Sequence, residues 1–123
     1  MSRIDISIIQ KETEKTLINK GFCRSPHVTF FCEQSQDPKL QDFAYSLDLG
    51  VTLSQENVAD FLQQLEYVVQ FLTTMEEAKR SSYFSSYNES SYEQFIEDLT
   101  NGRDMIQSFL KNKDFNHLEI EIV

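Results

Sequence analysis

Two long stretches in the second half of the chain repeat hydrophobic residues at helical spacing. In the first stretch, residues 58–75, the apolar positions recur every three or four residues: Val58, Phe61, Leu62, Leu65, Val68, Val69, Leu72 and Met75. Such a stripe predicts an amphipathic helix with one buried side. Ser54 lies just before the stretch, where its side chain is suited to cap the helix.

The second stretch covers residues 92–110 and has the same period. Ser90 and Glu93 match a capping box at its start. Gly102 interrupts the stretch but lies on the apolar stripe itself. The glycine therefore marks either a break in the helix or a place where the helix packs closely against a neighbour.

Strict alternation predicts strands elsewhere. Residues 43–53 alternate six apolar with five small or polar side chains, which is the pattern of a strand with one buried face. Residues 27–33 are rich in β-branched and aromatic residues and predict a partner strand, joined by a turn at residues 35–38. Gly50 would then mark a bulge. Residues 118–123 alternate again and predict a final strand.

Residues 4–20 fit two structures. Ile4, Ile6 and Ile8 alternate as in a strand, but a helical face also runs through residues 6–20. The polar run at residues 12–15 and the glycine at position 21, where a helix often ends, favour a helix over most of this segment. The pattern alone leaves open whether residues 4–9 are strand or helix.

These elements predict one domain, residues 1–123, of the α+β class. The expected order is α-β-β-α-α-β, with a small antiparallel sheet of about three strands packed on two or three helices in two layers. A chain of 123 residues that is 40% hydrophobic, with three glycines and two prolines, is large enough to bury such a core.

The charge is concentrated in the middle of the chain. Residues 42–98 hold eleven acids and two bases, so this block accounts for the whole net charge of −9. Nucleic-acid binding depends on clustered basic residues, and a domain this acidic is repelled by phosphate backbones. We therefore expect a basic protein partner and no nucleic acid.

No motif indicates catalysis, and we expect no enzyme, no catalytic residue and no cofactor. The chain lacks a glycine-rich phosphate loop, Gly-x-Ser-x-Gly and His-Glu-x-x-His. His27 and His117 are the two histidines, each at the start of a predicted strand. Cys23, His27 and Cys32 offer three metal ligands where a structural zinc site needs four, so no metal is expected and Cys32 is interpreted as a core residue.

The candidate binding surface combines acids with aromatic residues. On the helix at 58–75, steps of 100° place Asp60, Gln64, Tyr67 and Phe71 together and away from the core stripe, with Glu56 beside them. Aromatic anchors surrounded by charge are typical of interfaces. The alternative is that Tyr67 and Phe71 pack beneath a neighbouring helix.

The segment 80–92 continues this composition with tyrosines among six serines. Tyrosine and serine are common in adaptable binding loops, although a packed helix connector would also explain them. The acids Asp48, Glu119 and Glu121 are expected on the outer face of the sheet. We take seven residues as the partner-binding group: Glu56, Asp60, Tyr67, Phe71, Tyr83, Tyr87 and Glu89.

The leading hypothesis is a bacterial immunity protein or antitoxin that blocks the cationic site of a nuclease toxin domain. The alternatives are a secretion-type chaperone and a nucleic-acid mimic that inhibits a DNA-binding protein. The first residues do not resemble a signal peptide, and no apolar run is long enough to span a bilayer, so a cytoplasmic location without membrane contact is expected. The oligomeric state stays open.

Overall fold

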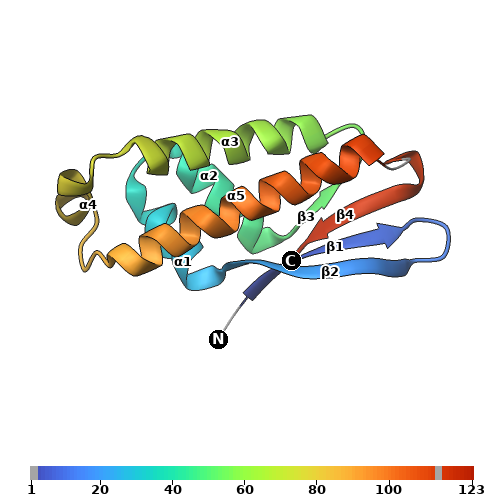
Figure 1. Ribbon diagram of the computed structural model, residues 1–123, viewed down its shortest axis with the longest axis horizontal. Helices are drawn as coiled ribbons and strands as arrows, with labels where there is room; N and C mark the ends of the chain where they lie inside the picture. Colours follow the sequence, from blue (N-terminus) through green and yellow to red (C-terminus); the bar gives the residue numbers. More distant parts are fainter. Residues whose placement is uncertain (1–2, 113–114) are drawn as a thin grey trace.

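The computed structural model describes residues 3–112 and 115–123, and it has the α+β architecture of a small antiparallel sheet packed on helices (Figure 1). Within these residues the sheet has four strands in the order β2-β1-β4-β3. The strands are β1 (Arg3–Gln10), β2 (Lys15–Arg24), β3 (Val51–Leu53) and β4 (Leu118–Ile122). Every neighbouring pair is antiparallel.

The helices are α1 (Ser25–Phe31), α2 (Pro38–Leu49), α3 (Val58–Thr74), α4 (Glu77–Tyr83) and α5 (Glu89–Asn112), with 3-10 turns η1 (Glu33–Ser35) and η2 (Phe115–His117). In Figure 1, α5 crosses one face of the sheet and α3 runs alongside α5, while α4 and the β1–β2 hairpin lie at opposite ends of the molecule. The core forms where these helices meet isoleucines of the sheet: Ile4, Ile6, Ile8, Ile120 and Ile122.

The helix predicted over residues 4–20 is wrong, because this segment is the β1–β2 hairpin. The alternation of Ile4, Ile6 and Ile8, which the sequence left open as a strand, is the correct signal. All three side chains are buried, and β1 pairs with β2 on one side and with β4 on the other. The polar run that favoured a helix forms the connecting turn, where Glu14 has a positive φ of 55°.

The two strands predicted at 27–33 and 43–53, and their hairpin, are also wrong. Residues 27–31 belong to α1, so His27 lies on a helix, and residues 43–49 belong to α2. Leucine, phenylalanine and alanine at helical spacing form the buried side of α2: Leu40, Phe43, Ala44 and Leu47. Only Val51–Leu53 is extended, and it forms the short edge strand β3.

The start of α2 explains why the helix prevails. The Asp37 carboxylate accepts hydrogen bonds from the backbone N–H groups of Lys39 (2.8 Å) and Leu40 (3.2 Å), and Pro38 occupies the first turn. An aspartate cap followed by proline favours helix initiation. At the other end, Gly50 follows the helix with a φ of 86°, so it is the C-cap of α2 and not a bulge in a strand.

The predicted helices of the second half are confirmed. Ser54 does not cap α3 directly, but its carbonyl accepts the N–H of Val58, the first helical residue. Helix α5 begins one residue before the predicted capping box, because the Asn88 side chain accepts the N–H of Ser91 at 2.9 Å.

Gly102 is a site of close packing and not a break. A Cβ atom at this position would lie 2.2 Å from the Phe22 ring of β2. The absence of a side chain therefore allows α5 to approach the sheet.

The final strand is confirmed as β4, but the predicted element order and strand number are wrong. Leaving out the 3-10 turns, the described order is β-β-α-α-β-α-α-α-β. Glu119 and Glu121 alternate with buried residues of β4, whereas Asp48 lies on α2 and so does not share their sheet face.

Candidate protein-binding surface

The predicted acidic-aromatic face of α3 divides into exposed acids and packed aromatics. Glu56 and Asp60 are exposed. The Tyr67 hydroxyl donates to the Asp37 carboxylate at 2.9 Å, and the Lys39 ammonium lies 4.6 Å from the Tyr67 ring centroid. That hydrogen bond raises the pKa of Tyr67, because the neutral phenol is the donor.

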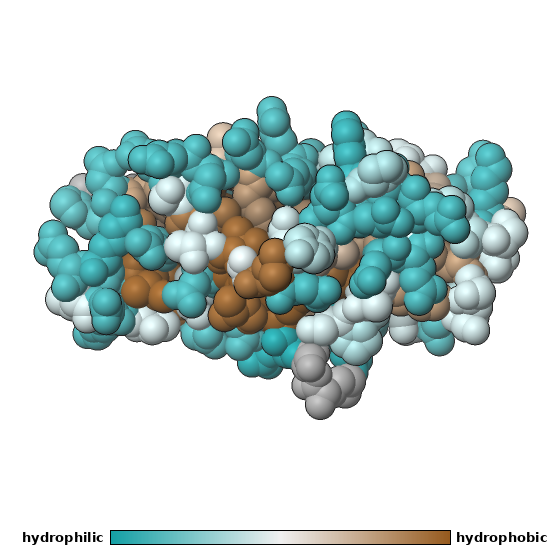
Figure 2. Space-filling view, turned by 180° about the vertical axis from the view of Figure 1, so that it is seen from behind, coloured by the Kyte–Doolittle hydropathy of each residue, from teal (hydrophilic) through white to brown (hydrophobic). Residues whose placement is uncertain are grey.

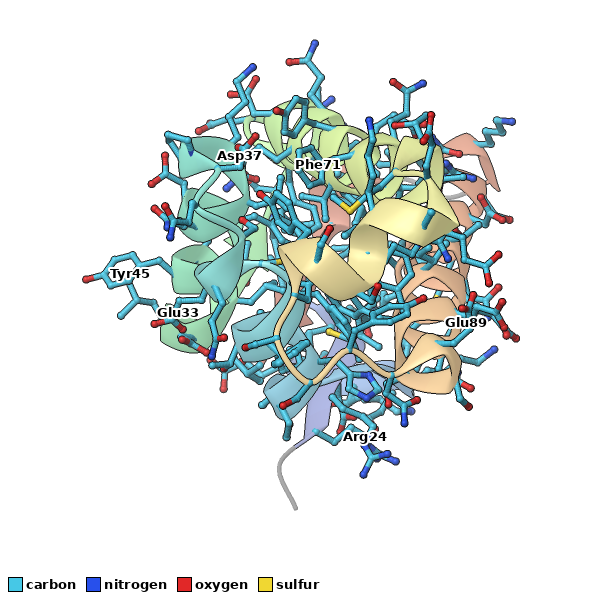
Figure 3. All side chains as sticks on the ribbon, turned by 90° about the vertical axis from the view of Figure 1, so that its left-hand side faces the viewer. Arg24, Glu33, Asp37, Tyr45, Phe71 and Glu89 are labelled. Atoms are coloured by element: carbon cyan, nitrogen blue, oxygen red, sulfur yellow. The ribbon has the colours of Figure 1, made fainter. Side chains whose placement is uncertain are left out.

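Phe71 packs inside the same part of the molecule. Its ring centroid is 6.4 Å from that of Tyr67 and 6.2 Å from that of Tyr83. In Figure 3 the Phe71 side chain points into the space enclosed by the helices. Both aromatics of α3 thus contact neighbouring elements, as the packing alternative expected.

The segment 80–92 also contacts the body of the protein. The Tyr83 hydroxyl donates to the carbonyl of Ser35, although 42% of the Tyr83 residue is exposed. Phe84 is buried, and Tyr87 packs against Tyr92 with ring centroids 5.6 Å apart. Burial raises the pKa of the Tyr87 phenol.

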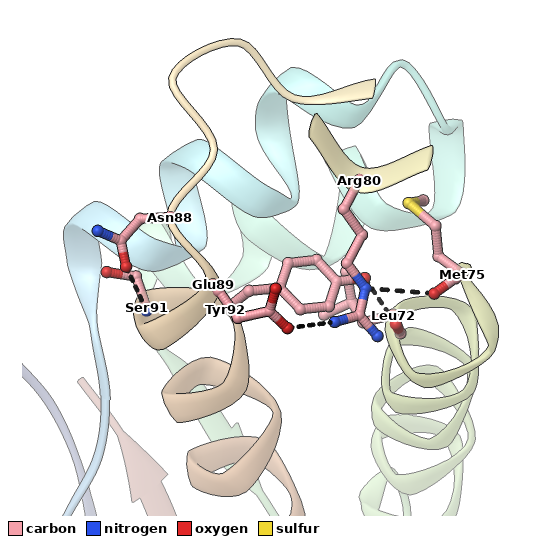
Figure 4. A network of polar contacts seen from close by, with 7 residues as sticks. All are labelled: Leu72, Met75, Arg80, Asn88, Glu89, Ser91 and Tyr92. Carbon is pink, nitrogen blue, oxygen red and sulfur yellow. Dashed lines mark hydrogen bonds and ion pairs between the residues drawn. The ribbon is translucent and has the colours of Figure 1, made fainter. Parts of the chain in front are cut away.

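Arg80 connects three helices in this region (Figure 4). Its guanidinium donates to the carbonyl of Met75 and to the carboxylate of Glu89, both at 3.2 Å. It also lies 4.3 Å above the centroid of Tyr92, whose hydroxyl donates to the carbonyl of Leu72 at 2.6 Å. Burial raises the pKa of Tyr92 to about 12, so the phenol stays a donor.

These contacts give the three predicted residues a structural role. Tyr83, the last residue of α4, bonds to Ser35; Glu89, the first residue of α5, bonds to Arg80 of α4; and Tyr87 between the helices packs on α5. Their contact with a partner stays a prediction.

A second acidic-aromatic surface lies on α2, where the sequence placed a strand. Tyr45 is 65% exposed and projects away from the body of the protein, with Glu33 beside it (Figure 3). Asp42 and Asp48, one helical turn before and after Tyr45, complete the group. We call Glu33, Asp42, Tyr45 and Asp48 the α2 surface.

The α2 surface surrounds an open hollow of about 480 Å³. Within residues 3–112 and 115–123, none of its three carboxylates forms an ion pair. Its negative charge is therefore available to an incoming cation.

Asp42 also links the α2 surface to α3. It borders a second hollow, of about 320 Å³, whose other lining residues are Lys39, Gln63, Gln64 and Tyr67. Asp60 lies one turn before Gln64 on the exposed side of α3. Asp42 of α2 therefore lies across this hollow from Gln63, Gln64 and Tyr67 of α3, and Asp60 lies one turn beyond its α3 side.

Apolar side chains accompany the α2 surface at the end of α2. Leu49 is 69% exposed and Val123 is 58% exposed, and both line a hollow of about 200 Å³ with Gly50 and Asp48. Figure 2 shows apolar residues gathered at the surface on this side of the molecule. An exposed apolar patch rimmed by charged residues, here Asp48 and Arg3, is a candidate site for contact with another protein.

Sequence reasoning missed the α2 surface because it assigned Tyr45 and Leu49 to a buried strand face. The signal that identifies the helix is local: Asp37 and Pro38 at a helix start, followed by apolar residues at helical spacing. A helix with that buried side leaves Tyr45 on the solvent side.

The described residues contain no group of three or more His, Cys, Asp or Glu side chains arranged to hold a metal ion. Cys23 and Cys32 are both free and buried, and burial raises the pKa of each thiol. None of the helices in the described residues is both long enough and apolar enough to cross a membrane.

Comparison with known proteins identifies no relative, since no family model, curated protein or solved structure matches this chain.

Proposed function

We propose that this protein is a non-enzymatic binding protein whose acidic surface neutralises a basic protein partner. The specific case that we propose is an immunity protein or antitoxin that inhibits a nuclease toxin. One observation carries the proposal: Tyr45 is 65% exposed among three carboxylates. An exposed aromatic residue among acids is suited to anchor a cationic partner.

The charge of the chain supports the same proposal at longer range. A net charge of −9 attracts a basic partner and speeds its association. Nuclease active sites carry positive charge because they bind phosphates, and the carboxylates of the α2 surface would take the place of those phosphates. Tyr45 would supply the contact that becomes desolvated in the complex.

The proposed contact group extends the α2 surface toward α3. Glu33, Asp42, Tyr45 and Asp48 form its centre, and Glu56, just before α3, and Asp60, in its first turn, extend it. Tyr67 and Phe71 support this group from within, since their rings pack against each other and Tyr67 is bonded to Asp37.

The test is co-purification with the product of the adjacent gene, followed by affinity measurements in a salt series. Raising the salt from about 50 mM to about 500 mM should weaken binding by roughly tenfold or more, because salt screens exposed charges. A binding constant that does not change with salt would contradict the proposal.

Charge variants locate the surface. The double substitution Asp42→Asn/Asp48→Asn should slow association and weaken binding. The matched control is Glu93→Asn/Glu97→Asn, which removes two exposed acids from α5. Equal losses for the two double variants would show a general charge effect and no specific surface.

Stoichiometry separates this function from the chaperone alternative. An immunity protein binds one folded partner, whereas a secretion chaperone dimerises and holds an unfolded segment. Light scattering of the complex distinguishes the two cases. Binding to a DNA-binding protein that is not a nuclease would favour the mimic.

A further inference from the structure

Strand β2 is a long edge of the sheet. It pairs with β1 on one side and ends the strand order β2-β1-β4-β3. It has ten residues, whereas β3, the other edge, has three. In Figure 1 the β1–β2 turn projects past the end of α5, and no described strand lies beyond β2.

An edge strand presents unpaired backbone N–H and C=O groups to solvent, which is the template for adding another strand. Seven consecutive residues of β2, from Lys15 to Gly21, are exposed. Among them Leu17 is 48% exposed and Ile18 is 38% exposed. β2 therefore offers both backbone groups and apolar side chains to a partner.

The pairing with β1 shows which side chains share a face. Lys20 lies opposite Ile6, Ile18 opposite Ile8, and Lys15 opposite Gln10. Ile6, Ile8 and Gln10 alternate along β1 and so point to one face of the sheet, the face that the helices cover. Directly paired residues of neighbouring strands share a face, and the register shift between Ile8 and Ile9 preserves this match. The three β2 residues therefore lie on the helix side of the sheet. On this face the edge strand thus presents Lys20, Ile18 and Lys15 one after another.

The charge here is opposite to that of the rest of the chain. Residues 11–24 contain four bases and two acids, in a chain whose net charge is −9. Within the part of the chain that the structure describes, neither Lys15 nor Lys20 forms an ion pair.

The same lysines argue against a second copy of this chain as the occupant. Two β2 edges side by side would gather four lysines at one junction, where like charges repel. A strand with carboxylates at the matching positions would be attracted instead. β3 of another copy has only three residues and offers little to pair with.

We propose that β2 is a strand-addition site for an extended acidic segment of a partner protein. The added strand places an apolar side chain beside Ile18 and carboxylates beside Lys20 and Lys15, while its backbone bonds to the free edge of β2. This site is separate from the α2 surface, and the proposal does not depend on the function proposed above.

The test uses a fluorescent heptapeptide with the sequence Thr-Glu-Thr-Val-Thr-Glu-Thr. In an extended strand its two glutamates and its valine share one face. Anisotropy titration against the whole protein should show binding, and replacing both glutamates by lysine should weaken it roughly tenfold, since cross-strand charge pairs change sign. Methylating the amide nitrogens on the edge of the peptide that pairs with β2 should remove binding, because strand addition needs those donors.

The protein variants complete the test. Lys15→Glu/Lys20→Glu should reverse the preference, so that the lysine peptide binds better than the glutamate peptide. Lys79→Glu makes the same kind of charge change on α4, at the other end of the molecule, and should leave the preference unchanged. Circular dichroism checks that each variant is folded, which is expected because all three lysines are exposed.

Several results would overturn the proposal: no binding of either peptide at millimolar concentration, equal binding of both, or full binding of the methylated peptide. A concentration-dependent dimer that Ile18→Lys dissociates would assign the edge to a second copy of the chain instead.

Discussion

Helices α2 and α3 both carry tyrosine among acids, yet their tyrosines lie in different environments. Tyr45 of α2 is 65% exposed, whereas Tyr67 of α3 bonds to Asp37 and lies beneath Lys39. Both positions are off the buried stripe of their own helix. The difference comes from the neighbours, since the start of α2 covers Tyr67 and no described helix covers Tyr45. A position off the stripe is therefore available to a partner only if no other element packs there.

The largest expected effect concerns partner binding. Tyr45→Ala should weaken binding of the basic partner about thirtyfold or more, the level of an interface anchor, without changing the melting temperature. Calorimetric titration of the purified complex measures this loss. The contrasting variant is Tyr67→Ala, which should lower the melting temperature, and a larger binding loss from Tyr67→Ala than from Tyr45→Ala would reverse the comparison.

The next effect tests the packed region around segment 80–92. Arg80→Ala removes two hydrogen bonds and the contact with the Tyr92 ring, so it should destabilise the protein by roughly 1–3 kcal/mol. Lys79→Ala is the matched control, because Lys79 is the adjacent basic residue on α4 with 72% of its side chain exposed. Urea unfolding measures both, and equal midpoints would show that the Arg80 contacts do not stabilise the fold.

A smaller effect isolates the bond between α2 and α3. Tyr67→Phe removes the hydroxyl that donates to Asp37 and should lower the melting temperature by less than Arg80→Ala does. Tyr45→Phe makes the same change at a residue with no intramolecular bond in the described structure, and it should leave the melting temperature unchanged. Thermal unfolding of the two variants shows whether the partly buried bond between Tyr67 and Asp37 distinguishes the two tyrosines.

The smallest effect is a pH dependence at His27. Its ring centroid lies 6.0 Å from that of Phe31 and 6.1 Å from that of Phe95. Burial, together with the nearby positive charge of Arg24, lowers the pKa of His27 below 6.5. The unfolded chain therefore binds this proton more readily than the folded protein does. The contribution of neutral His27 to the free energy of unfolding is fully present above about pH 6.5 and is lost as the pH falls toward the folded pKa.

His27→Gln should flatten this loss between about pH 7 and pH 5, whereas His117→Gln should retain it. Melting temperatures across this range measure the slope. An unchanged slope in His27→Gln would assign the acid sensitivity to another group.

The segment that the sequence predicted correctly, α3, and the segment that it predicted wrongly, residues 43–49, differ in whether the hydrophobic pattern fits one kind of element or two. The stripe of α3 fits one period only, and its buried residues are those expected, among them Phe61, Leu65 and Val68. In residues 43–49, Phe43 and Leu47 are buried, and they satisfy both a period of two and a helical spacing. A pattern that fits both periods does not by itself determine which side chains are buried.

Residues of the candidate site were predicted correctly only where the element that carries them was predicted correctly. Asp60 lies on the exposed side of α3 as expected, because that helix was predicted correctly, and Glu56 is exposed in the turn just before it. Tyr45 was missed, because a strand would have buried it, and Asp48 was expected on the outer face of the sheet and not on a helix. The capping signal of Asp37 and Pro38 was present in the sequence and was the information needed.

By itself the sequence determined the two long helices, the final strand, the α+β class and the concentration of acids in the middle of the chain. Each depends on local spacing or on composition, which folding does not alter. The tertiary structure decided the rest. β1 pairs along both its edges, with β2 and β4, and the pairing with β4, more than a hundred positions away, placed the N-terminal hairpin in the sheet. Packing between helices decided which tyrosine is covered, because the start of α2 contacts Tyr67, whereas Tyr45 is 65% exposed. Both outcomes depend on contacts between residues far apart in the sequence, which local spacing does not determine.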